Sequence, residues 1–141
     1  MTKIVETAQV GVPAAALWRD IGGFGAVADW HPMLARVTTE DDGEGALRTA
    51  EGQDGMRQTE RLLESSPEQR FYRYRLESSP MPVRDYVAEL RVEDNGDGTS
   101  TVVWSAEFEP TMTSFRTIEE IDEFLKSGLD GIAHLHRRVL K

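Results

Sequence analysis

The sequence lacks cysteine, an excess of basic residues and any long apolar run, and each absence excludes a class of protein. Without cysteine, the chain can form no disulfide, no thiolate metal site and no cysteine nucleophile. Its 16 Lys and Arg face 25 Asp and Glu, and this formal charge of −9 disfavours nucleic acid as a partner, because phosphates select for basic side chains. No apolar stretch reaches the ~20 residues of a membrane helix, so we expect no integral membrane association.

Length and local motifs narrow the remaining classes. The 141 residues have the size of one domain, and we expect residues 1–141 to form it. The N-terminal residues carry an acid at Glu6 and no apolar core, which is atypical of a secretory signal, so we expect a cytoplasmic protein. We expect no cofactor and no metal. His134 and His136 stand two apart on a predicted helix and point to different sides, so we interpret them as cations at its C-terminal end.

Turn-forming residues divide most of the chain into short segments. Pro13 is typical of a helix start and predicts a short helix over Ala14–Asp20. A second helical turn is predicted over Phe24–Trp30, ending before Pro32. Seven segments have the composition and the flanking turns of strands: 3–10, 33–40, 46–51, 56–64, 70–77, 83–93 and 100–109. Their short connections predict an antiparallel meander.

The C-terminal residues predict a long amphipathic helix over Ser114–Leu140. Apolar residues recur mostly every three or four positions, at Ile118, Ile121, Leu125, Ile132, Leu135 and Val139. Such a helix, about 40 Å long, must bury its apolar stripe, and the predicted sheet has one apolar face to cover. We therefore expect an α+β fold with the helix across a curved sheet. Gly128 and Gly131 either leave room above the sheet or let the helix pack closely on it.

Side-chain alternation along the strands indicates which residues face the helix. If 65–69 form a turn, Leu62 lies opposite Tyr72 and Glu60 opposite Tyr74, and opposite residues share a face. The other face then carries arginines, which require water. The same pairing places Tyr74 near a residue of the next strand, Tyr86, and adds two aromatic side chains to the inner face: Trp104 and Phe108.

Glu60 is the unusual residue on this inner face, because a carboxylate removed from water needs a partner or a proton. It is either a general acid or base in a partly apolar cavity, or a structural residue paired with a tyrosine hydroxyl or an arginine. His31 is either a proton carrier or a capping residue at the surface. Converging tyrosine hydroxyls favour a cavity with water or a ligand over a dry core. We predict Glu60 and His31 as polar site residues within an aromatic wall: Trp30, Tyr72, Tyr74, Tyr86, Trp104 and Phe108.

The order of several short motifs resembles that of a known superfamily. The motifs are Val12-Pro13-Ala14-Ala15-Ala16-Leu17-Trp18, Trp30-His31-Pro32, Glu60-Arg61-Leu62, Tyr72-Arg73-Tyr74 and Gly128-Leu129. They resemble the START-like (SRPBCC) superfamily and, within it, the polyketide cyclase/dehydrase and lipid transport family. The resemblance implies a helix-grip fold: a seven-stranded antiparallel sheet wrapped around a long C-terminal helix, with two short helices after the first strand. It also implies a hydrophobic cavity between sheet and helix.

Three functions are compatible with these observations. The leading hypothesis is binding of a hydrophobic or aromatic small molecule, lipid- or polyketide-like, in the internal cavity. The second is a polyketide cyclase or dehydratase in which Glu60 or His31 transfers the proton. The third is a non-catalytic protein-interaction module, which predicts a filled core and an exposed apolar patch. Members of the superfamily include binders and enzymes without a common catalytic motif, and an oligomer is compatible with any of the three.

Overall fold

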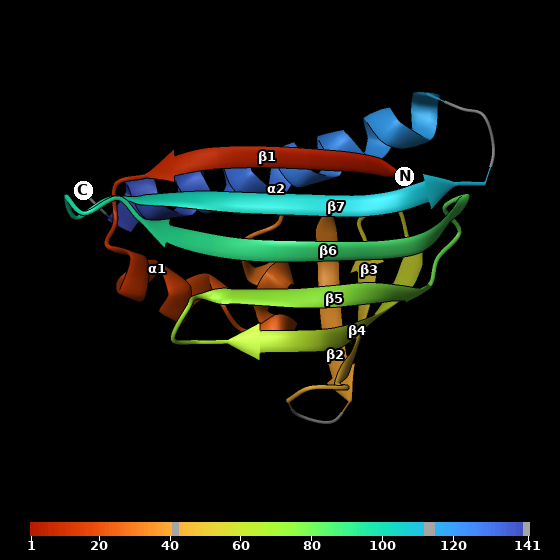
Figure 1. Cartoon of the computed structure of the whole chain (residues 1–141), viewed down its shortest axis with the longest axis horizontal. Coiled ribbons are helices and arrows are strands. Elements are labelled where there is room, and N and C mark those ends of the chain that lie inside the picture. The colour runs from red at the N-terminus through yellow and green to blue at the C-terminus, as the bar shows by residue number, and fades with distance from the viewer. Residues whose placement is uncertain (41–42, 112–114, 140–141) are drawn as a thin grey trace.

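A single curved sheet of antiparallel strands forms the framework of the protein (Figure 1). The computed structural model describes residues 1–40, 43–111 and 115–139. The strands are β1 (Thr2–Val10), β2 (Leu34–Glu40), β3 (Leu47–Gly52), β4 (Arg57–Ser66), β5 (Phe71–Ser78), β6 (Val83–Asp94) and β7 (Ser100–Pro110). Their order in the sheet is β1-β7-β6-β5-β4-β3-β2. The strands from β2 to β7 therefore form the predicted meander, and β1 completes the sheet beside β7.

The helices occupy the positions expected from the sequence. A short helix, α1 (Ala14–Ile21), and a 3-10 helix, η1 (Phe24–Asp29), follow β1. The long helix α2 (Phe115–Val139) follows β7 and contacts β1 and β7 (Figure 1). The predicted α+β helix-grip fold, with its seven-stranded antiparallel sheet and two short helices, is confirmed. The predicted helix ends, Ser114 and Leu140, lie outside the described residues.

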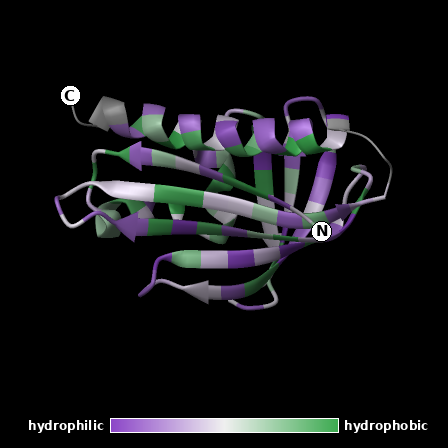
Figure 2. Cartoon of the chain, turned by 45° about the horizontal axis from the view of Figure 1, so that its top comes forward, coloured by the Kyte–Doolittle hydropathy of each residue, from purple (hydrophilic) through white to green (hydrophobic). Residues whose placement is uncertain are grey.

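Polar and apolar residues alternate along the strands, as Figure 2 shows by the change of colour from one residue to the next. The five aromatic residues predicted to face inward from β5, β6 and β7 are all buried, none more than 6% exposed: Tyr72, Tyr74, Tyr86, Trp104 and Phe108. Their burial confirms the predicted inner face of the sheet. No helix in the described part of the chain combines the length and apolarity needed to cross a membrane.

The predicted strand register is wrong by two residues. Leu62 pairs with Tyr74, Glu60 with Leu76, and Tyr74 with Ala88 instead of Tyr86. The strands continue to Ser66 and restart at Phe71, so the turn is shorter than predicted, and a bulge follows Leu62. Because side chains alternate with a period of two, this shift leaves every residue on its predicted face.

At two glycines, helix α2 packs closely on the sheet and on the connection between η1 and β2. A Cβ atom at Gly128 would lie 2.5 Å from Cζ3 of Trp104 and 2.7 Å from Cδ2 of His31. A Cβ atom at Gly131 would overlap the carbonyl oxygen of Trp30. Of the two explanations for these glycines, close packing is therefore correct, and they do not leave room above the sheet.

Near the C-terminal end of α2, His136 is buried. Its Nε2 atom lies 3.1 Å from the carboxylate of Asp20, and its Nδ1 atom lies 2.7 Å from the carbonyl oxygen of Ile132. His134 is exposed, so the two histidines do point to different sides. The sequence pattern missed this contact because Asp20 belongs to α1, which is distant in the chain.

The close packing predicts an unusual response to alanine at Gly131. In an exposed helix this substitution stabilises by about 1 kcal/mol. At Gly131, we expect it to lower the free energy of unfolding by about 1–3 kcal/mol, because α2 must move away from the backbone of Trp30. Urea denaturation would measure the loss, with the exposed neighbour Asp130→Ala as control. Equal stability of the two variants would contradict this account.

Candidate functional site

A pocket of about 410 Å³ opens between the N-terminal half of α2 and the inner face of the sheet. It is bounded by the start of β2, by β3, β4 and β6, and by the β5–β6 loop. Three methionines, from different connections between strands, contribute to its apolar wall: Met33, Met56 and Met81. Ile121 and Phe124 of α2 cover it from the other side. The pocket therefore lies where the long helix stands away from the sheet.

Glu60 lies in the wall of this pocket and forms a buried ion pair with Arg48. The two residues face each other across β3 and β4, and Arg48 Nε donates to Glu60 Oε1 at 2.7 Å. Their side chains are only 1% and 5% exposed. Of the alternatives for Glu60, the arginine partner is present. Sequence reasoning missed Arg48, although Arg48 alternates with Ala46 and Ala50 on the inward positions of the predicted strand.

Arg48 also joins several elements around the core. Its NH1 group donates to the carbonyl oxygen of Phe24 at 2.7 Å and to the hydroxyl of Tyr72 at 3.2 Å. The guanidinium lies 4.2 Å from the centre of the Phe24 ring and 4.6 Å from that of Tyr74. Burial opposes its charge, but Glu60 outweighs that effect, and the pKa of Arg48 is raised above its ordinary value. The ion pair thus connects η1 to β3, β4 and β5.

The carboxylate of Glu60 also affects the pKa values of two tyrosines. Burial, and then the negative charge of Glu60, raises the pKa of Tyr74 and of Tyr86 above the ordinary value for tyrosine. Both phenols therefore remain protonated at neutral pH and can donate hydrogen bonds. The Tyr74 hydroxyl accepts a bond from Trp104 Nε1 at 3.1 Å, within the core. Tyr86 lines the pocket, next to a β-bulge in which Asp85 has a φ of 54°.

His31 is held in the core behind Phe124. The Met33 N–H donates to Nδ1 at 3.2 Å, so the ring proton resides on Nε2, which donates to the carbonyl oxygen of Phe124 at 2.8 Å. The imidazole also stacks on the Phe124 ring, with 4.0 Å between ring centres. Burial lowers the pKa of His31 to about 4. His31 is therefore neutral at pH 7, and both its ring nitrogens are occupied.

The structure separates the predicted site residues into two groups. Glu60 and Tyr86 line the pocket. The others are buried in the core and do not belong to the described lining: His31, Trp30, Tyr72, Tyr74, Trp104 and Phe108. Sequence reasoning missed the lining methionines: Met81 lies in a connection, and Met33 and Met56, which it placed at the first positions of predicted strands, lie just before β2 and β4. It also missed Phe124, which lies off the predicted apolar stripe of α2.

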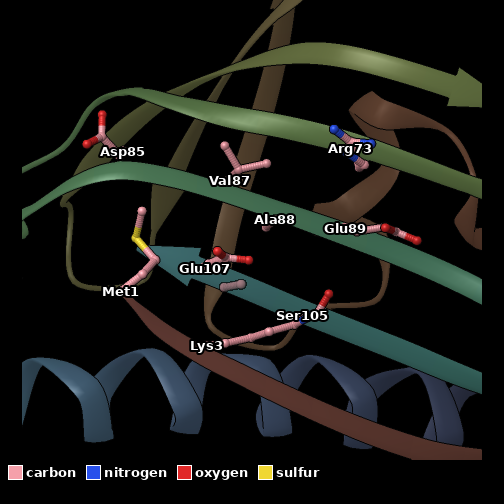
Figure 3. A pocket seen from close by; sticks show the side chains of 10 residues that line it. Met1, Lys3, Arg73, Asp85, Val87, Ala88, Glu89, Ser105 and Glu107 are labelled. Atoms are coloured by element: carbon pink, nitrogen blue, oxygen red, sulfur yellow. The ribbon is translucent and has the colours of Figure 1, made fainter. Parts of the chain in front are cut away.

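A second depression, of about 490 Å³, lies on the outer face of the sheet (Figure 3). Side chains of both charges share it, including Lys3, Arg73 and Glu89. The guanidinium of Arg73 is already paired with Glu64, at 3.2 Å. The described lining of this depression contains no buried charged side chain. The inner pocket, with its buried carboxylate and apolar wall, is therefore the better candidate site.

The chain matches a known family. Residues 1–136 match the family model for polyketide cyclase/dehydrase and lipid transport, and the chain belongs to this family of the START-like (SRPBCC) superfamily. It thus has the small-molecule-binding helix-grip fold of the family. No curated protein matches the sequence.

Several solved structures share this fold. An uncharacterised protein from Bacillus thuringiensis is 26% identical, with a TM-score of 0.89 over 96% of this chain and 98% of that chain. The aromatase/cyclase ZhuI from Streptomyces sp. R1128 is 17% identical, with a TM-score of 0.84 over 99% and 96%. Norcoclaurine synthase from Thalictrum flavum, solved with dopamine and hydroxybenzaldehyde, is 17% identical, with a TM-score of 0.75 over 95% and 85%. At 17% identity, the likeness to these two enzymes shows the fold alone.

The buried ion pair predicts a large cost when one partner loses its charge. We expect Glu60→Gln to lower the free energy of unfolding by about 3–5 kcal/mol, because Arg48 remains buried without a counter-charge. Replacing both partners, as Arg48→Met with Glu60→Leu, should cost less than Glu60→Gln alone. The control is Glu64→Gln in the exposed pair with Arg73, for which we expect a change of at most about 1 kcal/mol. Similar losses for Glu60→Gln and Glu64→Gln in urea denaturation would refute this assignment.

The burial of neutral His31 predicts a loss of stability in acid. The folded pKa of about 4 is below the unfolded value of 6.5, so the contribution is complete above pH 6.5 and is lost as the pH falls towards 4. Over that window, His31 should account for roughly 3 kcal/mol. We expect His31→Gln to be less stable at pH 7 but less sensitive to acid, whereas the exposed His134→Gln should retain the original pH dependence of the unfolding free energy. An unchanged slope in His31→Gln would show that His31 is not buried in its neutral form.

Proposed function

We propose that the protein binds a hydrophobic or aromatic small molecule in the pocket between α2 and the sheet. The observation that carries this proposal is the combination of an apolar wall with the buried polar groups of Glu60 and Tyr86 in one opening. Small-molecule sites usually have this composition and volumes of about 300–1,000 Å³. The bound ligand would lie among Met33, Met56, Met81 and Phe124, with Glu60 at its polar end.

The similar proteins give independent support to this proposal. The norcoclaurine synthase structure holds dopamine and hydroxybenzaldehyde, which are small aromatic molecules. The inner pocket of this chain is large enough for a molecule of that kind. An interaction module receives less support, because its prediction was a filled core without a pocket. Two of the exposed large hydrophobic residues, Met33 and Met56, lie in the pocket lining instead of forming a separate patch.

A cyclase or dehydratase is the second candidate, and the presence of Glu60 and Tyr86 in one pocket favours it. A carboxylate can accept a proton, and a protonated phenol can stabilise a developing enolate. His31 gives this candidate little support, because both its ring nitrogens are hydrogen-bonded behind Phe124. Proton transfer by Glu60 would disturb its ion pair with Arg48.

Blocking the pocket tests the proposed binding site. We expect the wild-type protein to bind 2-methoxynaphthalene saturably, and Met81→Trp to weaken binding by at least about tenfold because the indole fills the pocket. Val5→Trp is the matched control, since Val5 is an exposed residue of β1 outside the pocket lining. Calorimetric titration measures both affinities. Equal binding by the two variants would place the ligand elsewhere and contradict the proposal.

A further inference from the structure

The two carboxylate oxygens of Glu60, in the wall of the inner pocket, differ in their hydrogen bonds. Glu60 Oε1 accepts the short bond from Arg48 Nε at 2.7 Å. Glu60 Oε2 accepts only the longer bond from Gln58 Nε2, at 3.3 Å, among the described residues. A carboxylate oxygen can accept two hydrogen bonds. Since Glu60 lines the pocket and is only 4% exposed, Oε2 can accept a further hydrogen bond from a ligand bound there.

The arginine of the ion pair contributes no donor to this pocket. Arg48 is 1% exposed and does not belong to the described lining. Its guanidinium bonds to Glu60, to the carbonyl oxygen of Phe24 and to the hydroxyl of Tyr72. Arg48 therefore balances the charge of Glu60 from the core and not from the pocket. The side of the pair that faces the pocket is a hydrogen-bond acceptor with negative polarity.

Other charged residues reinforce this polarity. The described lining holds three carboxylates, from Asp54, Glu60 and Glu120, and one guanidinium, from Arg57, for a formal charge of −2. Arg57 is itself paired with Glu51 at 2.9 Å, and Glu120 is paired with Arg116 at 3.2 Å. At Glu60, a ligand carboxylate would meet repulsion, because it would place an acceptor against Oε2. A ligand with a hydroxyl or amine would place a donor there.

We infer that the pocket selects an apolar ligand that carries a hydroxyl or amine donor, bound by Glu60 Oε2, and discriminates against the corresponding carboxylate. This inference rests on the proposed function, because it assumes that the pocket is the binding site. It identifies Glu60 as the residue that determines specificity. Arg48 is a positioning residue that holds the Glu60 carboxylate in its orientation.

Three ligands with one skeleton test the inference: 2-naphthol, 2-methoxynaphthalene and 2-naphthoate. By calorimetric titration at pH 7, we expect 2-naphthol to bind about tenfold more tightly than 2-methoxynaphthalene, since a hydrogen bond to a charged acceptor has about this effect or more. We expect 2-naphthoate to bind more weakly than both. Equal affinities for the three, or tighter binding of 2-naphthoate, would overturn the inference while leaving the proposed function intact. Binding of none of them would count against the proposed function itself.

A double substitution tests the role of Glu60 without leaving a buried charge. In Arg48→Met with Glu60→Leu, we expect the tenfold preference for 2-naphthol to disappear while 2-methoxynaphthalene still binds. Circular dichroism and thermal melting would establish that the variant is folded. A preference that persists in the folded variant would exclude Glu60 as the acceptor. If the variant does not fold, the comparison of the three ligands on the wild-type protein still decides the inference.

Discussion

The buried ion pair of Arg48 and Glu60 is the constraint on which the rest of the inner structure depends. Arg48 satisfies Glu60 and, at the same time, bonds to η1 and to Tyr72 of β5. Neither charge is stable in this position alone, because the cost of removing an ion from water is offset only when both partners are present. The pair therefore specifies how the 3-10 helix sits against three neighbouring strands. It also gives the adjacent pocket its single buried carboxylate.

The sequence predicted the architecture well because the signals involved are local. Alternation along the strands placed Tyr86 and Trp104 on the inner face, although the register was wrong by two residues. The residues that make up the candidate site were harder to predict. Strand parity brought Glu60 inward but could not show that Arg48 lay directly across from it, because that pairing required the register of β3 and β4. The methionines of the pocket occur in connections, whose conformation depends on the whole fold.

Burial alone proved to be a poor guide to the candidate site. Most of the predicted aromatic wall, including Trp30 and Trp104, packs ring against ring, with 5.4 Å between their centres. These rings form the core on which the site rests. The pocket instead uses residues that are partly exposed, such as Met33 and Met56, and a few polar groups held by the core. A sequence pattern readily identifies buried core residues, but it gives almost no signal for the partly exposed residues that line a pocket.

Two parts of α2 differ in a way that bears on how such a pocket can diversify. Around Gly128 and Gly131, near the middle of the helix, even a methyl group does not fit against Trp104 of the sheet and the backbone of Trp30. Around Ile121 and Phe124, in its N-terminal half, the helix borders the pocket. Substitutions around Ile121 and Phe124 can therefore enlarge or reshape the pocket for a different ligand, while the close contacts at the two glycines, and with them the fold, stay unchanged.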